Sequence, residues 1–327
     1  MIYQKKTLLV GALSATLAFA AAPVVAETYI VAVGAPANSL QGRSAAKFAE
    51  DLQTALGDAH TIEFYSDAQL GDERELMQKL RLGTVHFTLI SSIMTNVAPE
   101  FALFDLPFLV QDREHLKAID AEIVQTALAP KAEDAGLKVL STWENGFRHV
   151  TNSVRPINVP GDLDGLKIRT PSSEWRVAMF EEWGANPTPM AFSEVFVALQ
   201  TGTMDGQENP LTNITGANFQ EVQKYLSMTG HVYSPSYLTT GLGVWNDLPS
   251  GVQAAVTEVA SAVQGWALAE GEKADNELVD KVVAAGMEVN VADKAAFIAA
   301  SAPVYEAFAE QVEGGSELIA RAQALAN

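Results

Sequence analysis

The chain contains no cysteine among its 327 residues. This absence excludes disulfides, thiol nucleophiles, thiolate zinc sites, iron–sulfur ligation and haem attachment through cysteine. The hydrophobic core must therefore stabilise the fold by itself, which a chain of this length allows. It also leaves no residue to which a lipid could be attached after the apolar N-terminal run.

Basic residues are scarce: 21 lysines and arginines face 40 acidic residues, for a formal charge of −19. Two of the lysines, Lys5 and Lys6, precede an uncharged apolar run from Thr7 to Ala20, and small residues follow up to Ala26. This layout predicts a secretory signal peptide over residues 1–26 that is cleaved after Ala26. The run is shorter than the roughly 20 residues that a membrane span needs, which argues against an anchor.

Removal of the predicted signal peptide takes away two lysines and no acid, so the charge of the mature chain becomes −21. A protein this negative repels nucleic acids and anionic lipid surfaces, and we expect it to bind neither. If the ligand is an anion, it must be held by a few well-placed cations. Individual buried arginines are therefore the residues to look for.

Motifs of enzymes and metal sites are also missing. None of the five histidines is spaced with another histidine or an acid as a zinc site requires. The sequence has no Gly-x-Ser-x-Gly elbow and no phosphate-binding loop, and Gly241-Leu242-Gly243 lacks the third glycine of a dinucleotide fingerprint. We expect no metal, no cofactor and no catalytic residue. The alternative is a secreted hydrolase or lyase that uses Glu73 or Glu208 as a base.

Short apolar segments alternate with amphipathic ones, which predicts an α/β fold with a mainly parallel sheet. Asp72 and Glu75 have the spacing of a helix capping box, and Gly83 marks the end of that helix. The expected strands are 28–33, 61–65, 86–90, 137–143, 147–152, 166–170, 239–245 and 287–291. The expected helices are 39–56, 72–82, 173–183, 192–199 and a long one from 249 toward 285.

Three polar residues are candidates for ligand contacts. Arg169 ends a predicted strand, where open α/β sheets place their ligands, and its planar fork suits a carboxylate. Arg148 follows the turn signal Glu144-Asn145-Gly146. Asn209 lies in a polar segment, 205–210, that reads as a turn. From spacing alone, a structural salt bridge is slightly favoured for Arg169. For Arg148, local sequence does not decide between a ligand contact and an ordinary ion pair.

Taken together, these motifs resemble those of the DctP-type solute-binding proteins of TRAP transporters, the tripartite ATP-independent periplasmic systems. The resemblance covers most of the chain after residue 26. It rests on the segments Gln69–Glu75, Phe104–Phe108, Asn145–Arg148, Gly165–Arg169, Asn186–Phe192, Ala198–Gly202, Asp205–Pro210 and Glu221–Tyr225. Each segment is weakly specific alone, whereas their number and order are specific.

The resemblance implies two α/β lobes with a ligand cleft between them, joined by crossing strands and a long spanning helix. The first lobe would comprise residues 27–150 and 238–278, and the second lobe residues 151–237 and 279–327. Arg169 would hold the ligand carboxylate, Arg148 would add a second cation, and Asn209 would hydrogen-bond the same end. The other implied ligand contacts are Phe192, Glu73, Ser91 and Ser172.

The resemblance also implies a non-enzymatic periplasmic protein whose partners are a small organic acid and the membrane subunits of a TRAP transporter. We expect a monomer that binds a sugar acid such as a uronate or an aldonate. Ser91 and Met94 stand where the sialic-acid binders have an acid and an arginine, which argues against sialic acid. A dicarboxylate or an aromatic acid stays open, and Trp175 offers a surface that would favour a flat ligand. A sensor that reports to a membrane receptor is a further possibility.

Overall fold

The computed structural model of the protein describes residue 2 and residues 27–326. Residue 2 apart, the predicted signal peptide lies outside the described residues. The strands are β1 Glu27–Ala32, β2 His60–Tyr65, β3 Phe87–Ile90, β4 Leu137–Asn152, β5 Lys167–Thr170, β6 Asn186–Pro189, β7 Gly206–Pro210, β8 Tyr225–Gly241 and β9 Glu288–Val291. The helices before β8 are α1 Leu40–Leu56, α2 Glu73–Leu82, α3 Arg113–Ile119, α4 Ala129–Asp134, α5 Glu174–Glu182, α6 Val195–Gln200 and α7 Leu211–Gly216. Those after β8 are α8 Leu242–Asp247, α9 Ser250–Ala284, α10 Lys294–Ala299, α11 Ala302–Gln311 and α12 Gly315–Ala324.

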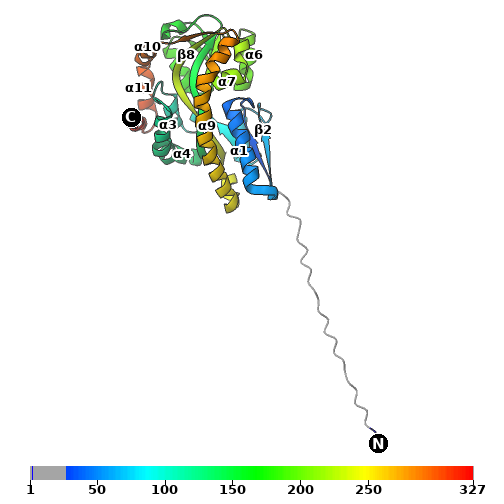
Figure 1. The fold of residues 1–327 in the computed structure, drawn as a ribbon. Helices are drawn as coiled ribbons and strands as arrows, with labels where there is room; N and C mark the ends of the chain where they lie inside the picture. The colour runs from blue at the N-terminus through cyan, green and yellow to red at the C-terminus, as the bar shows by residue number, and fades with distance from the viewer. Residues whose placement is uncertain (1, 3–26, 327) are drawn as a thin grey trace.

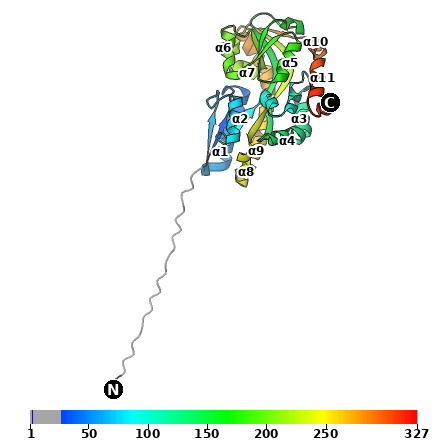
Figure 2. The ribbon, with the colours of Figure 1, turned by 180° about the vertical axis from the view of Figure 1, so that it is seen from behind.

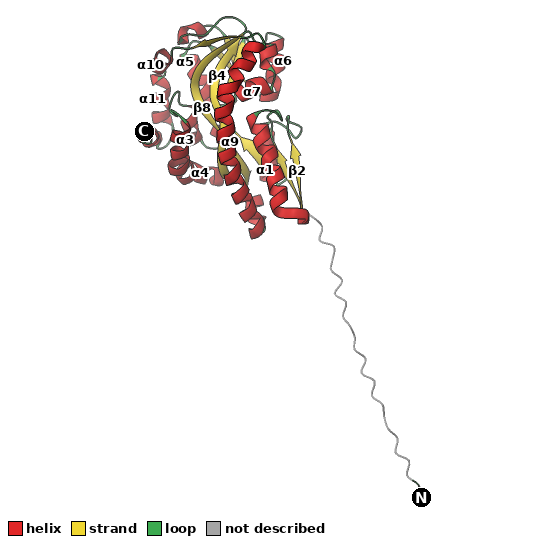
Figure 3. Ribbon diagram, in the orientation of Figure 1, coloured by secondary structure: helices red, strands yellow, loops and turns green. Residues whose placement is uncertain are grey.

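Two groups of elements form two lobes, and three long elements run from one lobe into the other (Figure 1). The first lobe contains β1, β2, β3, α1 and α2, and the second contains β5, β6, β7, α5, α6 and α7. Strands β4 and β8 curve through both lobes beside helix α9 (Figure 3). Val256 of α9 and Leu238 of β8 pack into the core around α1, whereas Val282 of α9 and Leu226 of β8 pack with α6 and α7. The predicted two-lobed fold with crossing strands and a spanning helix is therefore confirmed.

The sheet is mixed rather than mainly parallel. Its strand order is β2-β1-β3-β8-β4-β7-β5-β6, with β9 paired to β8. Pairing is parallel between β1 and its neighbours and between β5 and its neighbours, but β4 is antiparallel to both β7 and β8. The short strands at the two ends follow the parallel pattern that alternating helices predict. The centre is antiparallel because two long strands cross between the lobes in opposite directions.

Strand β4 corrects the expectation of two separate strands. Residues 137–152 form one strand along β8, and the pairing register shifts between Glu144 and Gly146. Gly146 has a φ of +125°, a backbone conformation that residues with a side chain rarely adopt. The Glu-Asn-Gly segment is thus a bulge at the crossing between the lobes and not a turn.

Two further segments differ from the sequence-based assignment. Residues 206–210 were expected as a turn and form strand β7, paired with both β4 and β5. Residues 242–245 were expected to continue a strand and belong to helix α8 instead. The predicted capping box is confirmed, because Asp72 accepts from the Glu75 N–H and the Glu75 side chain accepts from the Asp72 N–H. Gly83 ends helix α2 in the left-handed conformation, also as predicted.

Helices α2 and α5 are seen in the view from behind (Figure 2). Trp175 of α5 is buried and makes an edge-to-face contact with Phe308 of α11, with ring centroids 5.4 Å apart. The expectation that Trp175 offers a surface to a flat ligand is therefore wrong, because the ring is buried in the core against α11. Within residues 27–326, no helix has a stretch long and apolar enough to cross a membrane.

Candidate functional site

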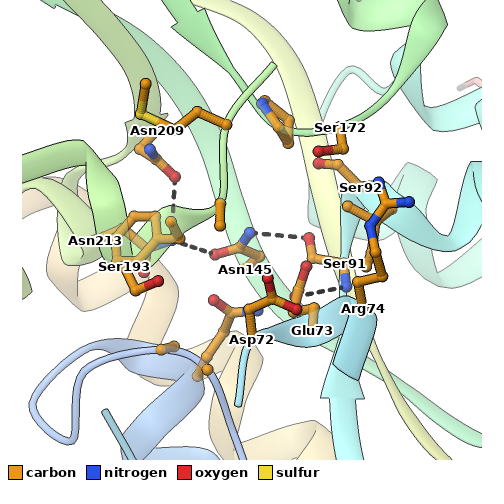
Figure 4. Close-up of a pocket in the computed structure, with 18 of the residues that line it drawn as sticks. Asp72, Glu73, Arg74, Ser91, Ser92, Asn145, Ser172, Ser193, Asn209 and Asn213 are labelled. Atoms are coloured by element: carbon orange, nitrogen blue, oxygen red, sulfur yellow. Dashed lines mark hydrogen bonds between the residues drawn. The ribbon is translucent and has the colours of Figure 1, made fainter. Parts of the chain in front are cut away.

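A cleft between the two lobes encloses about 710 Å³ of empty space, including its opening to solvent. Its walls come from the carboxyl ends of β1, β3, β5 and β6, from the start of α2, and from the middle of β4 and the β7–α7 junction. Open α/β sheets place their ligands at such strand ends. Ten of the polar lining residues are labelled in Figure 4. The cleft is the candidate binding site.

Arg169 is a buried cation on the cleft wall without a carboxylate partner. Its side chain is 3% exposed, and Nε and Nη2 donate to the carbonyl oxygen of Met190 at 3.0 and 2.5 Å. Its guanidinium carbon lies 5.8 Å from the centre of the Phe192 ring. Within the described chain, no Asp or Glu oxygen lies within 4.0 Å of this guanidinium. Burial lowers the pKa of Arg169 to about 9, so the group stays charged at neutral pH.

Arg148 also lines the cleft but is held by the protein's own acid. Its Nε and Nη2 donate to the two carboxylate oxygens of Glu208 at 2.5 and 2.8 Å, a bidentate pair. Nη2 further donates to the Glu208 carbonyl oxygen at 2.7 Å and to Asn209 Oδ1 at 3.1 Å. The salt-bridge reading therefore holds for the bond to Glu208. A second role of Arg148 toward a ligand stays a proposal.

Glu208 is the centre of a buried ion network behind the cleft. Besides Arg148, it accepts from Arg176 Nη1 at 2.8 Å, and its Oε2 lies 3.1 Å from His231 Nε2. Arg176 also donates to Asp105 at 2.5 Å. Burial alone would raise the pKa of Glu208, but the two arginines and His231 hold that pKa below its ordinary value. Burial lowers the pKa of His231, so its ring is neutral at physiological pH.

The charges of this region do not cancel. Three buried arginines, Arg148, Arg169 and Arg176, face two buried carboxylates, Glu208 and Asp105, which leaves one positive charge. A buried unpaired charge costs several kcal/mol unless a counter-ion arrives. The unmatched charge belongs to Arg169, the one of the three without a carboxylate contact among the described residues. Arg169 thus brings to the cleft wall a buried positive charge that has no salt bridge within the described chain.

Glu73, at the start of α2, is one of the two carboxyls that line the cleft in the described chain, and its charge interacts with that of Arg169. It accepts a hydrogen bond from the Ser91 N–H at 3.1 Å, and the two residues face each other in Figure 4. Burial raises the pKa of Glu73 to about 7, although Ser91 N–H, Arg169 and Arg148 pull the pKa down. At neutral pH this carboxyl is thus partly protonated. It offers both a donor and an acceptor to ligand hydroxyls.

Glu73→Gln is expected to change how stability depends on pH. The folded-state pKa of Glu73 is raised, so its stabilising contribution is complete below the unfolded pKa of about 4.5 and is lost as pH rises through about 7. We therefore expect the variant to gain stability relative to wild type between pH 5 and pH 8, on the order of 1 kcal/mol after solvent screening. Urea denaturation of both proteins at the two pH values measures this difference. Glu50→Gln, at an exposed position of α1, is the control, and parallel curves for wild type and Glu73→Gln would contradict the assignment.

A relay of side-chain hydrogen bonds joins the two walls of the cleft (Figure 4). Asn213 Nδ2 donates to Asn209 Oδ1 at 3.3 Å and to Asn145 Oδ1 at 3.1 Å. Asn145 Nδ2 donates in turn to Ser91 Oγ at 3.0 Å. Because Asn209 lies in the second lobe and Ser91 in the first, this relay crosses the bulge of β4. It fixes the orientation of four polar side chains that line the cleft.

The structure brings all seven predicted contact residues to this cleft. Phe192 packs against the Arg169 guanidinium and against Phe219, where it forms an apolar wall. The Ser172 carbonyl oxygen accepts from Asn96 Nδ2 at 2.7 Å, across the cleft rim. Both hydrogen-bonding roles of the Ser91 hydroxyl are used, since it accepts from Asn145 and donates to the Pro235 carbonyl oxygen at 2.8 Å. The roles of these residues toward a ligand stay predictions.

Sequence reasoning missed several polar residues of the lining: Gln41, Asp72, Arg74, Ser92, Asn145, Ser193 and Asn213. Asn145 lies within the apparent turn signal, which explained this residue without a ligand. Asn213 begins an Asn-Ile-Thr tripeptide, a pattern that also occurs at glycosylation sites. Polar residues inside otherwise buried runs were the available signal. The buried partners Arg176 and Asp105 were also missed, because residues 71 positions apart give no local pattern.

Residues 31–311 match the family of bacterial extracellular solute-binding proteins called family 7, or DctP. One curated relative, described only as a solute-binding protein of Verminephrobacter eiseniae, is 40% identical over 277 residues, which cover 84% of this chain and 82% of the relative. The match therefore spans nearly all of the described chain.

Two solved structures of TRAP periplasmic solute-binding proteins are similar in fold. One, from Polaromonas, was solved with bound D-erythronate, has a TM-score of 0.87 and 34% identity, and the match covers 92% of this chain and 99% of that chain. The other, from Sulfurospirillum deleyianum, was solved with bound succinate, has a TM-score of 0.87 and 30% identity, and the match covers 92% of this chain and 100% of that chain. One of these two proteins thus has a hydroxylated monocarboxylate bound, and the other a dicarboxylate.

Proposed function

Because this chain belongs to family 7 of the bacterial extracellular solute-binding proteins, we propose that it is the periplasmic component of a TRAP transporter and captures a sugar acid through Arg169. The observation that carries the proposal is the buried Arg169 guanidinium, which lines the cleft and has no carboxylate within 4.0 Å in the described chain. An acid that enters the cleft supplies the missing negative charge. Membrane subunits of the transporter would then receive the ligand.

The carboxylate must recover the hydration that it loses in the cleft. Each charge-assisted hydrogen bond contributes about 1.5–3 kcal/mol, so a bidentate contact with Arg169 offsets much of the desolvation cost. Arg148 adds positive potential from the neighbouring strand, and Asn209 Nδ2 keeps one hydrogen after its bond to Gln207 Oε1. The Phe192 ring closes the apolar side. We propose that these four residues hold the acid end of the ligand.

The opposite wall favours hydroxyl groups over a second charge. Glu73, Gln41 and Ser92 all line the cleft there and can accept or donate hydrogen bonds to hydroxyls. Glu73 carries a partial negative charge at neutral pH, which opposes a second carboxylate of the ligand. A monocarboxylate with several hydroxyls matches both walls. The D-erythronate bound to the Polaromonas protein has this chemistry.

We expect sugar acids to raise the melting temperature of the ligand-free protein. Binding to the folded state alone stabilises it by about 4 kcal/mol at a ligand concentration 1,000 times Kd, so the shift is readily measured by calorimetry. Aldonates and uronates should raise the melting temperature, and the neutral sugars of the same carbon skeleton should not. Equal shifts with neutral sugars would contradict the proposed contact between Arg169 and a ligand carboxylate. Shifts with aromatic acids alone would contradict the proposal that the ligand is a sugar acid.

A dicarboxylate is the second candidate, and one lining residue favours it. Arg74 supplies a further cation in the cleft, and the Sulfurospirillum relative has succinate bound. Yet Arg74 is exposed and stands between Glu73 and Glu75 on the first turn of α2, so its charge is partly offset by carboxyls on the same turn. Titration of succinate at pH 8, where Glu73 is ionised, decides between the candidates. Tighter binding of succinate than of aldonates at that pH would favour the dicarboxylate.

The hydrolase alternative finds little support in the cleft. Glu208 is held by two arginines and His231, so it cannot act as a free base. Glu73 has a suitable pKa, but its one recorded hydrogen-bond partner within the described chain is a backbone N–H and not a nucleophile. If mass spectrometry shows that the ligand is recovered unchanged after long incubation, turnover is excluded.

The sensor alternative has its own test. Loss of ligand uptake on deletion of the transporter genes would favour transport, and intact uptake would favour a sensor role.

A further inference from the structure

The relay between the cleft walls fixes the orientation of the Asn145 amide. A carbonyl oxygen can only accept, so the Ser91 hydroxyl donates its single hydrogen to the Pro235 carbonyl oxygen, 2.8 Å away. Ser91 Oγ must therefore accept from the neighbouring amide, and the Asn145 atom 3.0 Å away is the Nδ2 donor. It follows that Asn145 presents its Oδ1 to Asn213.

The other end of the relay is fixed by an arginine. A guanidinium only donates, so the Asn209 atom 3.1 Å from Arg148 Nη2 is the acceptor Oδ1. Asn209 Nδ2 is engaged by Gln207 Oε1, which agrees with this orientation. Asn213 thus faces an acceptor on both sides, Asn209 Oδ1 and Asn145 Oδ1. Both hydrogens of its Nδ2 are used, and flipping the amide would break both bonds.

The remaining atom of Asn213 is an orphan acceptor. Its Oδ1 has no hydrogen-bond partner in the part of the chain that the structure describes, and the residue is 3% exposed. Asn213 nevertheless lines the cleft, beside Phe192 and Ser193. A buried acceptor without a donor is costly, whereas the relay forbids the rotation that would relieve it. The described chain therefore supplies no donor to this oxygen of a cleft-lining residue.

We propose that Asn213 Oδ1 accepts a hydrogen bond from the ligand hydroxyl on the carbon next to the carboxylate. The inference rests on the proposed function, because the carboxylate is placed by Arg169. Asn213 is one hydrogen bond away from Asn209 and two away from Arg148, which confines its donor to the acid end of the ligand. The substrate class then narrows to 2-hydroxy acids, of which aldonates are the polyhydroxylated kind. A pyranose uronate carries its ring oxygen on that carbon and offers no donor there.

Isothermal titration of the ligand-free protein with a hexonate and with the matching 2-deoxyhexonate tests this inference. Wild type should bind the hexonate about 10- to 100-fold more tightly, since the deoxy ligand leaves the buried acceptor unpaired. Asn213→Leu should bind both ligands within about threefold of each other, because the discriminating atom is gone. Asn213→Ala repeats the test with a smaller side chain, in case leucine does not fit. Asn96→Ala, at the cleft rim, should keep the wild-type ratio.

The outcomes separate the inference from the function on which it rests. If wild type binds both ligands equally, the hydroxyl contact is wrong while the sugar-acid function stands. If wild type binds the hexonate more tightly and both Asn213 variants keep the same affinity ratio, another residue contacts the hydroxyl. If neither acid binds to wild type, the proposed function itself fails. A water molecule on Asn213 Oδ1 in place of the ligand would give equal binding of the two acids.

Discussion

Replacing Arg169 with methionine is expected to weaken the binding of organic acids by about two to four orders of magnitude while leaving the unliganded protein as stable as wild type. The loss follows from the removal of a bidentate charge-assisted contact, about 3–5 kcal/mol at 1.4 kcal/mol per factor of ten. Methionine keeps most of the aliphatic volume beside Phe192, so the packing of the wall persists. Titration calorimetry with a sugar acid measures the effect.

The stability of the same variant is the more diagnostic observation. Arg169 has no carboxylate partner in the described chain, and burial lowers its pKa to about 9, which means that the folded state keeps this charge at a cost. Removing the charge removes that cost and leaves the Met190 carbonyl oxygen to water in the cleft. We expect a melting temperature equal to or above that of wild type. An unfolded variant would show that Arg169 is a structural residue.

Arg169→Lys is the matched control for geometry. Lysine keeps the positive charge but cannot reproduce the planar two-donor fork that fits a carboxylate. It should retain part of the affinity, at a level between those of wild type and the methionine variant. If Arg169→Lys binds as poorly as Arg169→Met, then geometry and not charge dominates the contact. Wild-type affinity in Arg169→Met would rule out Arg169 as the carboxylate site.

Local sequence signals were enough to predict elements whose start and end are set by residues within or next to the element itself. The capping box of Asp72 and Glu75 and the left-handed Gly83 define α2 within ten residues, and both are as predicted. Strand β4 was misread because its decisive contacts are distant: thirteen of its residues pair with β8, and this pairing overrides the turn propensity of Glu-Asn-Gly. The same reason explains β7, whose polar residues read as a turn but lie between two other strands.

The candidate site could be predicted in part for a related reason. A strand end with an arginine predicts a ligand contact, and Arg169 and Arg148 both line the cleft. Which arginine is neutralised depends on Glu208, which lies 60 residues from Arg148 and 39 from Arg169 and contacts the first only. Sequence also cannot assign the amide orientations that leave Asn213 Oδ1 without a donor. Those orientations follow from the chain of partners that begins at Pro235 and Arg148.

The second large effect is expected at Arg176, the buried arginine that does not line the cleft. Its guanidinium joins Asp105 to Glu208, and all three side chains are nearly or fully buried. Arg176→Met removes a cation from between two carboxylates, and breaking such a buried pair costs about 3–5 kcal/mol. At roughly 2–4 °C per kcal/mol, the melting temperature should fall by on the order of 10 °C. Scanning calorimetry measures the fall directly.

Two further variants separate charge from packing in this effect. Arg43→Met breaks a pair with Glu270 that is partly exposed, and it should cost no more than about 1 kcal/mol. Adding Asp105→Asn to Arg176→Met removes the carboxylate that the first change leaves unpaired. The double variant should therefore be more stable than Arg176→Met alone, although methionine fills the same space in both. If the second change only adds to the loss, the network stabilises the protein through packing, and the ion pair of Arg176 with Asp105 does not govern the stability of this region.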